Sequence, residues 1–274
     1  MIIVIIDIGL KNLSWIVVEL PLENGFQVDM TKTIQQNSQI LCETIQQMET
    51  RILDWHRGNV VDDEEKVTNN IGYLLVEYVK KHLCEPFLKN QNVFYVVELQ
   101  VSSVILNVTL ENVLRSFLKS GGGGVQTCLG YQTLHSKSKF TKTQEFFDKF
   151  ASLCQLPFKF PLPNSQAHNM KSASERRVES ILHNYDKNHE VLRSIKKWHI
   201  VNFEEFRKVY FSENKQNDRA DVLIGLICVL DSITKHNNHE MIISYLNQVC
   251  GFVIKKRKKV ASFYKDEKLS VITK

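Results

Sequence analysis

Four acidic residues stand at places where the chain passes from one apolar segment to another element. Asp7 follows five consecutive apolar residues, and Glu98 follows a second short apolar run. Asp218 and Asp221 come much later and open a segment whose remaining positions are almost wholly apolar. Residues three apart share one face of a helix, so these two carboxylates are expected to point at a common ion.

Carboxylate oxygens are hard ligands of the kind that Mg²⁺ prefers, and such a site needs no histidine or cysteine cluster. Two Mg²⁺ ions roughly 4 Å apart activate a water nucleophile, stabilise charge on a phosphate and assist the leaving oxygen. The ends of two buried strands and the start of one helix would bring the four acids together. The pattern therefore predicts a metal-dependent nuclease centre that uses Mg²⁺, with Mn²⁺ as a substitute.

Each acid also has a plainer local interpretation. A lone Asp7 after an apolar strand is commonly a turn residue, and Glu98 alone is typical of a strand end at the surface. Asp218 with Asn217 fits a helix cap, while Asp221 fits the positive end of the helix dipole. Only the order of the four acids along three separated segments favours the shared site.

The first elements are predicted to be three antiparallel strands. Residues 2–6 form a continuous β-branched run, which is expected for a central strand buried on both faces. Residues 13–20 fit its hairpin partner, and an Asn-Gly turn then leads to a third strand over 26–30. A later strand is predicted over 93–97.

Apolar residues recur at helical spacing in several further segments. A helix is predicted over 40–55 with Ser38 as its cap, and others over 67–83 and 103–118. A run of glycines ends the last of these, and a strand over 125–129 is expected after it.

The second half of the chain is harder to interpret. Residues 140–213 contain three prolines and several basic residues between short helical patterns. Helices are predicted over 218–233, where apolar residues bury one side, and over 240–249.

The 274 residues are expected to form one elaborated nuclease domain over 1–250. Insertions are predicted around 38–90 and 140–216. A basic tail over 251–274 contains the lysine-rich run 255–259, which fits a DNA-backbone contact, a localisation patch or a solvated tail.

Composition narrows the class of protein. Lysine and arginine outnumber aspartate and glutamate by 35 to 30, so the net charge of +5 favours a polyanionic partner. The six cysteines show no close pairing, and there is neither a secretory signal nor an N-terminal apolar stretch long enough to span a bilayer. We therefore expect a soluble intracellular protein with reduced cysteines and no membrane partner.

Three motifs in this order resemble those of RuvC-like Holliday junction resolvases within the RNase H-like superfamily. The resemblance is greatest to the resolvases of poxviruses and other large DNA viruses and of fungal mitochondria. Residues 7–12 (DIGLKN) look like their first strand signature, residues 97–100 (VELQ) like their second acid and residues 218–221 (DRAD) like their terminal acidic helix. Leu99 departs from the viral motif, which more often has a polar residue there.

The resemblance implies an α/β RNase H-like fold, a central mixed five-stranded sheet flanked by helices, with helical insertions. It also implies a homodimer that cuts two opposed strands of a four-way DNA junction at the site of DNA replication, with Asp7, Glu98, Asp218 and Asp221 as catalytic metal ligands. Residues expected to contact DNA come from the motifs and from a basic segment that fits a solvated loop equally well: Lys11, Asn12, Gln100, Lys137, Lys139 and Lys142.

Two other classes of function remain open. Actin-like and sugar-kinase-like ATPases also begin with a strand that ends in Asp-x-Gly, but the chain has no convincing second phosphate loop. The run of four glycines lacks the Lys-Ser/Thr of a P-loop. A catalytically silent protein of the same fold that binds branched DNA is the other alternative, and the presence of all four acids argues against it.

Overall fold

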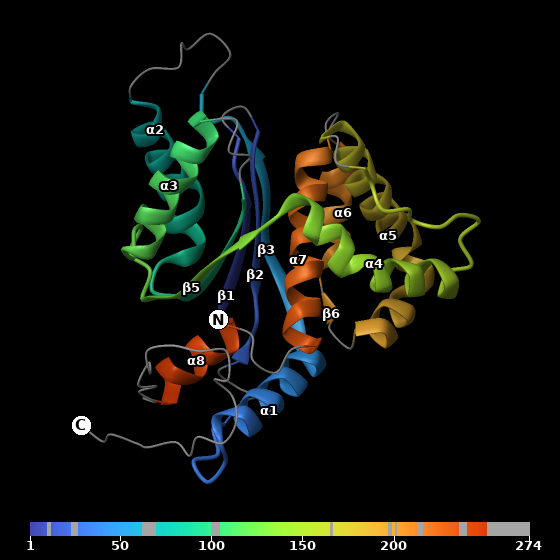
Figure 1. Ribbon diagram of the computed structural model, residues 1–274, viewed down its shortest axis with the longest axis horizontal. Coiled ribbons are helices and arrows are strands. Elements are labelled where there is room, and N and C mark those ends of the chain that lie inside the picture. The colour runs from blue at the N-terminus through green and yellow to red at the C-terminus, as the bar shows by residue number, and fades with distance from the viewer. Residues whose placement is uncertain are drawn as a thin grey trace.

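A mixed sheet lies at the centre of the computed structural model (Figure 1). The strand order is β5-β4-β1-β2-β3, and a two-residue strand, β6, extends the β3 edge. The bounds are β1 (Ile2–Asp7), β2 (Leu13–Glu19), β3 (Glu49–Gly58), β4 (Asn92–Glu98), β5 (Thr127–Leu134) and β6 (His199–Ile200). The structure describes residues 1–9, 12–22, 27–61, 70–99, 105–164, 167–196, 199–200, 202–212, 216–235 and 240–250.

Strand directions identify the fold. β2 is antiparallel to both β1 and β3, whereas β4 is parallel to β1 and to β5. Five strands in the order 3-2-1-4-5, with only the second reversed, form an RNase H-like sheet. The predicted fold class is therefore confirmed, as is the hairpin of the first two strands.

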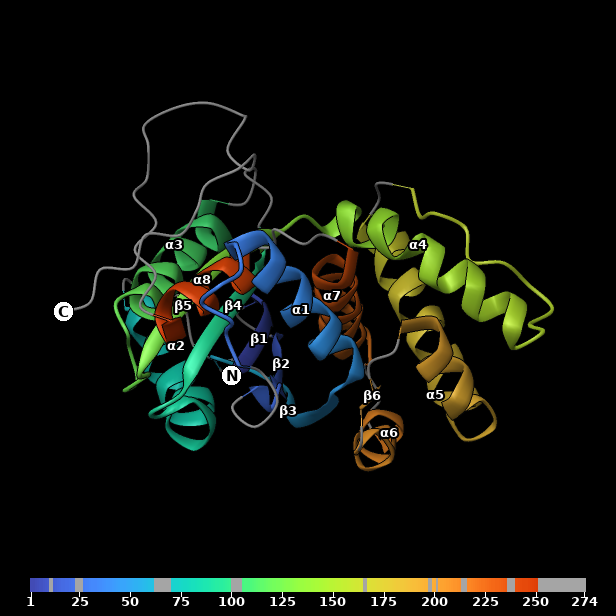
Figure 2. The same cartoon turned by 90° about the horizontal axis from the view of Figure 1, so that it is seen from below.

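Helices cover both faces of this sheet (Figures 1 and 2). On one face, α2, its continuation η2 as a π-helix and α3 bury one apolar cluster against β1 and β4. On the other face, α7 lies on β1 and β2, and α4 and α5 pack against α7 from outside. The helices span α1 (Ile34–Gln47), α2 (Ile71–Val79), η2 (Lys80–Leu88), α3 (Ile105–Lys119), α4 (Ser136–Leu153), α5 (Ala167–Lys196), α6 (Phe203–Ser212), α7 (Asn217–Lys235) and α8 (Glu240–Cys250).

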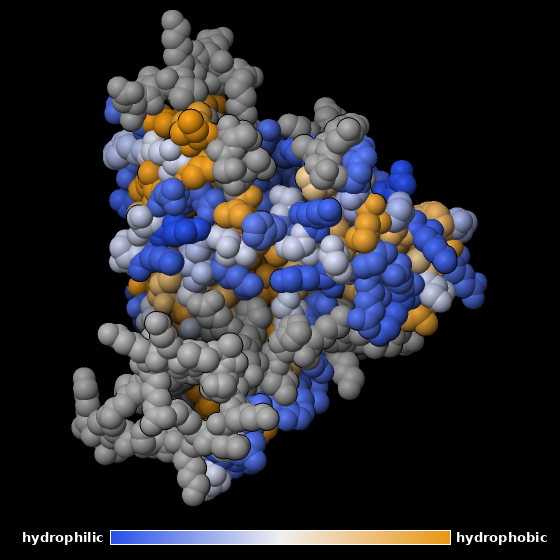
Figure 3. Space-filling model, in the orientation of Figure 1, coloured by the Kyte–Doolittle hydropathy of each residue, from blue (hydrophilic) through white to orange (hydrophobic). Residues whose placement is uncertain are grey.

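The helices α4 and α5 form an outer layer, whose surface is mostly hydrophilic (Figure 3). Its inner side meets α7, whose residues from Asp218 to Asp231 are all buried. Among the described helices, none combines the length and the apolarity that crossing a bilayer requires.

The predicted third strand and the first helix are wrong. Residues 27–30 form no strand, and the third strand is β3, which occupies the second half of the helix predicted over 40–55. The helix α1 begins earlier because Thr33, and not Ser38, caps it through a reciprocal capping box with Gln36.

The other predicted elements differ mainly at their ends. β5 starts two residues later than predicted and runs on to Leu134. The helix predicted over 67–83 continues to Leu88, and the helices expected over 103–118, 218–233 and 240–249 are found. The segment 140–213, which gave no clear pattern, holds most of α4 and all of α5 and α6.

Candidate metal centre

Two parallel strands bring the first two acids to the same edge of the sheet. Ile6 of β1 pairs with Val97 of β4, so Asp7 and Glu98 follow at adjacent ends of these strands. The residues of both strands that precede these acids are buried, apart from Asn92 at the start of β4, and each acid is partly exposed.

Side chains of the sheet fix the start of α7 close to this edge. Ser14 Oγ of β2 donates a hydrogen bond to the carbonyl oxygen of Asp218 at 3.0 Å. Trp55 Nε1 of β3 donates to the carbonyl oxygen of Arg219, also at 3.0 Å. These contacts hold the first turn of α7 against β2 and β3 and leave Asp221 facing the ends of β1 and β4.

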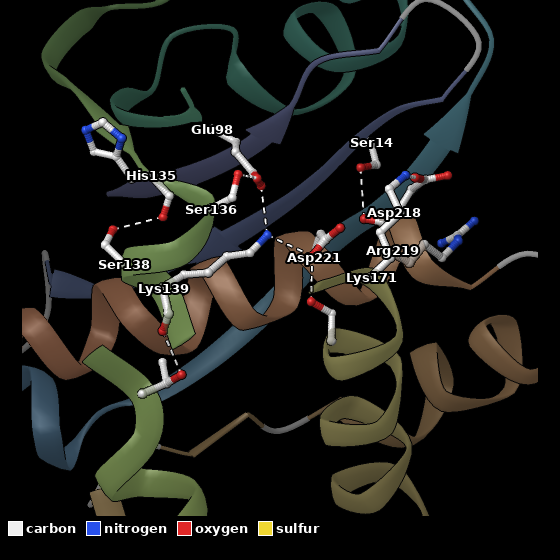
Figure 4. A network of polar contacts seen from close by, with 12 residues as sticks. Ser14, Glu98, His135, Ser136, Ser138, Lys139, Lys171, Asp218, Arg219 and Asp221 are labelled. Carbon is white, nitrogen blue, oxygen red and sulfur yellow. Dashed lines mark hydrogen bonds and ion pairs between the residues drawn. The ribbon is translucent and has the colours of Figure 1, made fainter. Parts of the chain in front are cut away.

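Lys139 lies between two of the acids (Figure 4). Its Nζ is 2.8 Å from Glu98 Oε2 and 2.7 Å from Asp221 Oδ1. Hydroxyl groups hold the same carboxylates from the other side: Ser136 Oγ donates to Glu98 Oε1, and Ser174 Oγ donates to Asp221 Oδ1 at 2.6 Å. Two helices of the outer layer, α4 and α5, therefore complete the site.

Lys139 is more deeply buried than its predicted role suggested. We expected it to contact DNA from a basic surface segment, but only 1% of the residue is exposed. Its Nζ lies 5.7 Å from the centroid of the Phe140 ring, and the two acids hold the ammonium inside the protein. Lys139 is an internal partner of Glu98 and Asp221, and its contact with DNA stays a prediction.

Asp7 has the least compensated charge of the group. With the described residues its carboxylate makes no hydrogen bond or ion pair, while its backbone pairs with Ser14 in the sheet. Burial raises the pKa of Asp7 well above its ordinary value, and repulsion from Glu98 and Asp221 raises it further, against the opposing effect of Lys139. Burial likewise raises the pKa of Asp221, although Lys139 counteracts the effect.

Asp218 has a different environment from the other three acids. Its side chain is 1% exposed, and its two oxygens face two cations: Arg57 Nε at 3.2 Å and Lys171 Nζ at 3.0 Å. Arg57 Nη2 also donates to Asn12 Oδ1 at 2.9 Å. Sequence reasoning missed both cations. Arg57 lies near the end of β3, most of which was predicted to be helix, and Lys171 lies in the segment without a clear pattern.

The donor set fits a divalent ion in chemistry. Asp7, Glu98 and Asp221 offer hard oxygen ligands, and the repulsion that raises the pKa of Asp7 is what a bound cation relieves. Within the described ranges, however, no group of three or more His, Cys, Asp or Glu side chains is arranged to hold a metal. The ammonium of Lys139 instead separates Glu98 from Asp221, so the role of the four acids as metal ligands stays a prediction.

The other residues predicted to contact DNA have varied positions. Lys137 and Lys142 are exposed on α4, and Asn12 is half-buried beside Arg57. Their role stays a prediction. Lys11, Gln100 and the basic tail over 251–274 lie outside the described residues.

Comparison with known proteins gives matches of structure only. No protein-family model and no curated protein sequence matches the chain. The yeast mitochondrial Holliday junction resolvase Ydc2 aligns over 91% of this chain and 84% of its own, with 14% identity and a TM-score of 0.46.

Two further solved structures carry related descriptions. The fowlpox virus Holliday junction resolvase aligns over 91% of this chain and 99% of its own, with 11% identity and a TM-score of 0.38. Thermus thermophilus RuvC in complex with Holliday junction substrate covers 68% of this chain and 96% of its own, with 13% identity and a TM-score of 0.29. These alignments report a likeness of fold to Holliday junction resolvases, while the RNase H-like assignment itself rests on the order and direction of the strands.

Proposed function

We propose that this chain is a Holliday junction resolvase: a Mg²⁺-dependent endonuclease that cuts branched DNA and accepts Mn²⁺ in place of Mg²⁺. The observation that supports the proposal is the meeting of Asp7, Glu98 and Asp221 around the buried ammonium of Lys139 at one edge of an RNase H-like sheet. The four-way junction as substrate and action inside the cell at the site of DNA replication come from the motif resemblance.

The proposed chemistry is hydrolysis of a phosphodiester by water. A divalent ion held by Asp7, Glu98 and Asp221, together with Asp218, would supply activation of that water and neutralisation of charge on the phosphate. Ser136 and Ser174 orient Glu98 and Asp221 through hydrogen bonds.

Lys139 contributes a fixed positive charge to the same site. Because it is buried, this charge acts on a phosphate through a medium less polar than water. Lys139 therefore offsets part of the negative charge that accumulates when a phosphate enters a site lined by acids.

The test is cleavage of a panel of DNA substrates: a four-way junction, a three-way junction, a flap and a linear duplex. Asp7→Asn and Glu98→Gln are expected to abolish cleavage of the four-way junction and to leave its binding largely intact. Asp148→Asn is the matched control, because Asp148 is an exposed acid in the second half of α4. Full cleavage by both site variants excludes this centre, and binding without cleavage by the unaltered protein favours the catalytically silent alternative.

A homodimer is part of the proposal, because two symmetric strands of a junction must be cut. Sedimentation of the protein with and without junction DNA tests it. We expect a dimer in both cases, and a monomer in both would contradict this part of the proposal.

A further inference from the structure

Two cations from different elements meet at one buried acid beside the proposed centre. Arg57 comes from β3 and Lys171 from the first turns of α5, and both contact the carboxylate of Asp218. The side chains of the cations are 24% and 39% exposed, whereas that of the acid is 1% exposed. The positive groups therefore face solvent, and the negative group lies beneath them.

The balance of charge differs between the two halves of the site. Lys139 supplies one positive charge to two acids, Glu98 and Asp221. Arg57 and Lys171 supply two positive charges to one acid. Counting only these ion-paired groups, the deep half carries one net negative charge and the outer half carries one net positive charge.

The outer pair is prearranged and has donors to spare. Arg57 uses Nε for Asp218 and Nη2 for Asn12, and its Nη1 makes no hydrogen bond with any residue in the described part of the chain. The ammonium of Lys171 has three hydrogens and donates to Asp218. A guanidinium and an ammonium held side by side are suited to an oxyanion, and anchoring them on Asp218 lowers the entropic cost of binding it.

We propose that Arg57 and Lys171 form a phosphate-binding pair, here called the rim pair, which holds a DNA backbone phosphate next to the one that is cleaved. This inference rests on the proposed function and adds a binding site to it. Asp218 serves the rim pair as its anchor.

The spacing along α7 agrees with a neighbouring phosphate. Asp218 precedes Asp221 by three residues, which is about 4.5 Å along a helix axis. One nucleotide advances a DNA strand by about 3.4 Å along the duplex axis. Both spacings correspond to about a single step, so the rim pair is placed for a phosphate near the one at Asp221 and Glu98 and not for one several nucleotides away.

The test measures binding of a four-way junction as a function of salt, in the presence of a chelator so that cleavage does not intervene. Arg57→Met and Lys171→Met remove one charge each and leave an unbranched, uncharged side chain. Each is expected to weaken binding and to reduce the slope of log K against log salt by up to about 0.9, the value for loss of the one phosphate contact that the two cations share. Lys149→Met is the matched control, because Lys149 is an exposed lysine near the C-terminal end of α4, away from the rim pair. The salt slope of this variant should equal that of the unaltered protein.

A second arm locates the phosphate. Junctions that carry one neutral methylphosphonate, placed in turn at each phosphate next to the cleavage position, replace a single backbone charge. One such junction is expected to bind the unaltered protein more weakly than the natural junction does. The same junction is expected to bind Arg57→Met and Lys171→Met as well as the natural junction binds these variants. Inorganic phosphate added as a competitor distinguishes a general anion site from one that requires the DNA backbone. The proposal expects that millimolar phosphate does not displace the junction.

The outcomes separate this inference from the proposed function. If folded Arg57→Met and Lys171→Met keep the salt slope of the unaltered protein, the two cations only balance Asp218 and the rim pair is refuted. Arg57→Lys, which retains the charge, should keep the slope, so a loss there also contradicts the proposal. If the unaltered protein binds no branched DNA, the proposed function fails with it, whereas junction binding with unchanged slopes refutes the rim pair alone.

Discussion

Replacing Lys139 by methionine tests the electrostatics of the candidate centre without any assay of activity. The change removes an ammonium that is 2.8 Å from Glu98 and 2.7 Å from Asp221 and fills the same space with an apolar chain. The side chains of these two acids are 15% and 7% exposed, so neither can be fully solvated in exchange. Breaking a buried ion pair by removing one partner costs about 3–5 kcal/mol.

We therefore expect Lys139→Met to lower the free energy of unfolding by about 3 kcal/mol at mildly alkaline pH in a chelator. Urea unfolding followed by circular dichroism measures it. Lys149→Met removes an exposed ion pair with Glu145 and is expected to cost less than about 1 kcal/mol, which makes it the control.

The loss should depend on pH with a definite sign. The pKa values of Asp7 and Asp221 are raised in the folded protein above their ordinary value of 3.8, chiefly by burial. Without the opposing charge of Lys139 both rise further. A raised carboxyl pKa favours the folded state at low pH and loses this effect as pH rises through the folded pKa, so the variant should approach the unaltered protein in stability as pH falls toward 3.8.

Divalent ions give the corresponding test near neutral pH. Because a ligand that binds only the folded state stabilises it, Mg²⁺ or Mn²⁺ should restore more stability to Lys139→Met than it adds to the unaltered protein. Equal stability of the two proteins in chelator at mildly alkaline pH would refute the reasoning. So would a loss that does not change with pH.

Three further predictions concern other parts of the molecule. Asp7→Asn should raise the free energy of unfolding of the metal-free protein at mildly alkaline pH, since it removes a carboxylate whose pKa is raised by burial, and a fall in the urea midpoint would contradict this. Gly58→Ala should lower the free energy of unfolding by about 1–3 kcal/mol, because the added Cβ would lie 2.0 Å from the hydroxyl oxygen of Tyr78. Tyr78→Phe in the same chain should recover part of the loss in a thermal melt, and an unchanged melting temperature for the single variant would count against the packing. Burial raises the pKa of Cys42 to about 11 and of Cys84 to about 12, so brief iodoacetamide treatment of the native protein should leave both thiols unmodified by mass spectrometry, and rapid labelling would show that they are accessible.

The strands that carry Asp7 and Glu98 were predictable because a continuous apolar run has one stable environment, a strand buried on both faces. The segment 40–55 was not, since its apolar residues fit a helical period throughout, although α1 ends at Gln47 and β3 begins at Glu49. The sheet decides in favour of a strand, because β3 pairs with β2 along the whole length of β2.

The environment of Lys139 was beyond sequence reasoning for a related reason. Lys137, Lys139 and Lys142 look alike along the chain, and the packing of α4 against α7 determines which one turns inward. Arg57 and Lys171 escaped notice in the same way, because their meeting at Asp218 depends on contacts more than 40 residues apart in sequence.

The burial of α7 on all sides has a consequence for the architecture. A helix that is apolar around its whole circumference needs a neighbour on each flank, and here the sheet provides one and α4 with α5 the other. The helices α4 and α5, which lie largely in the segment 140–216 predicted as an insertion, therefore cover the side of α7 that faces away from the sheet. Trimming the chain to a minimal sheet core would remove this cover from α7, and the fragment is expected to be insoluble.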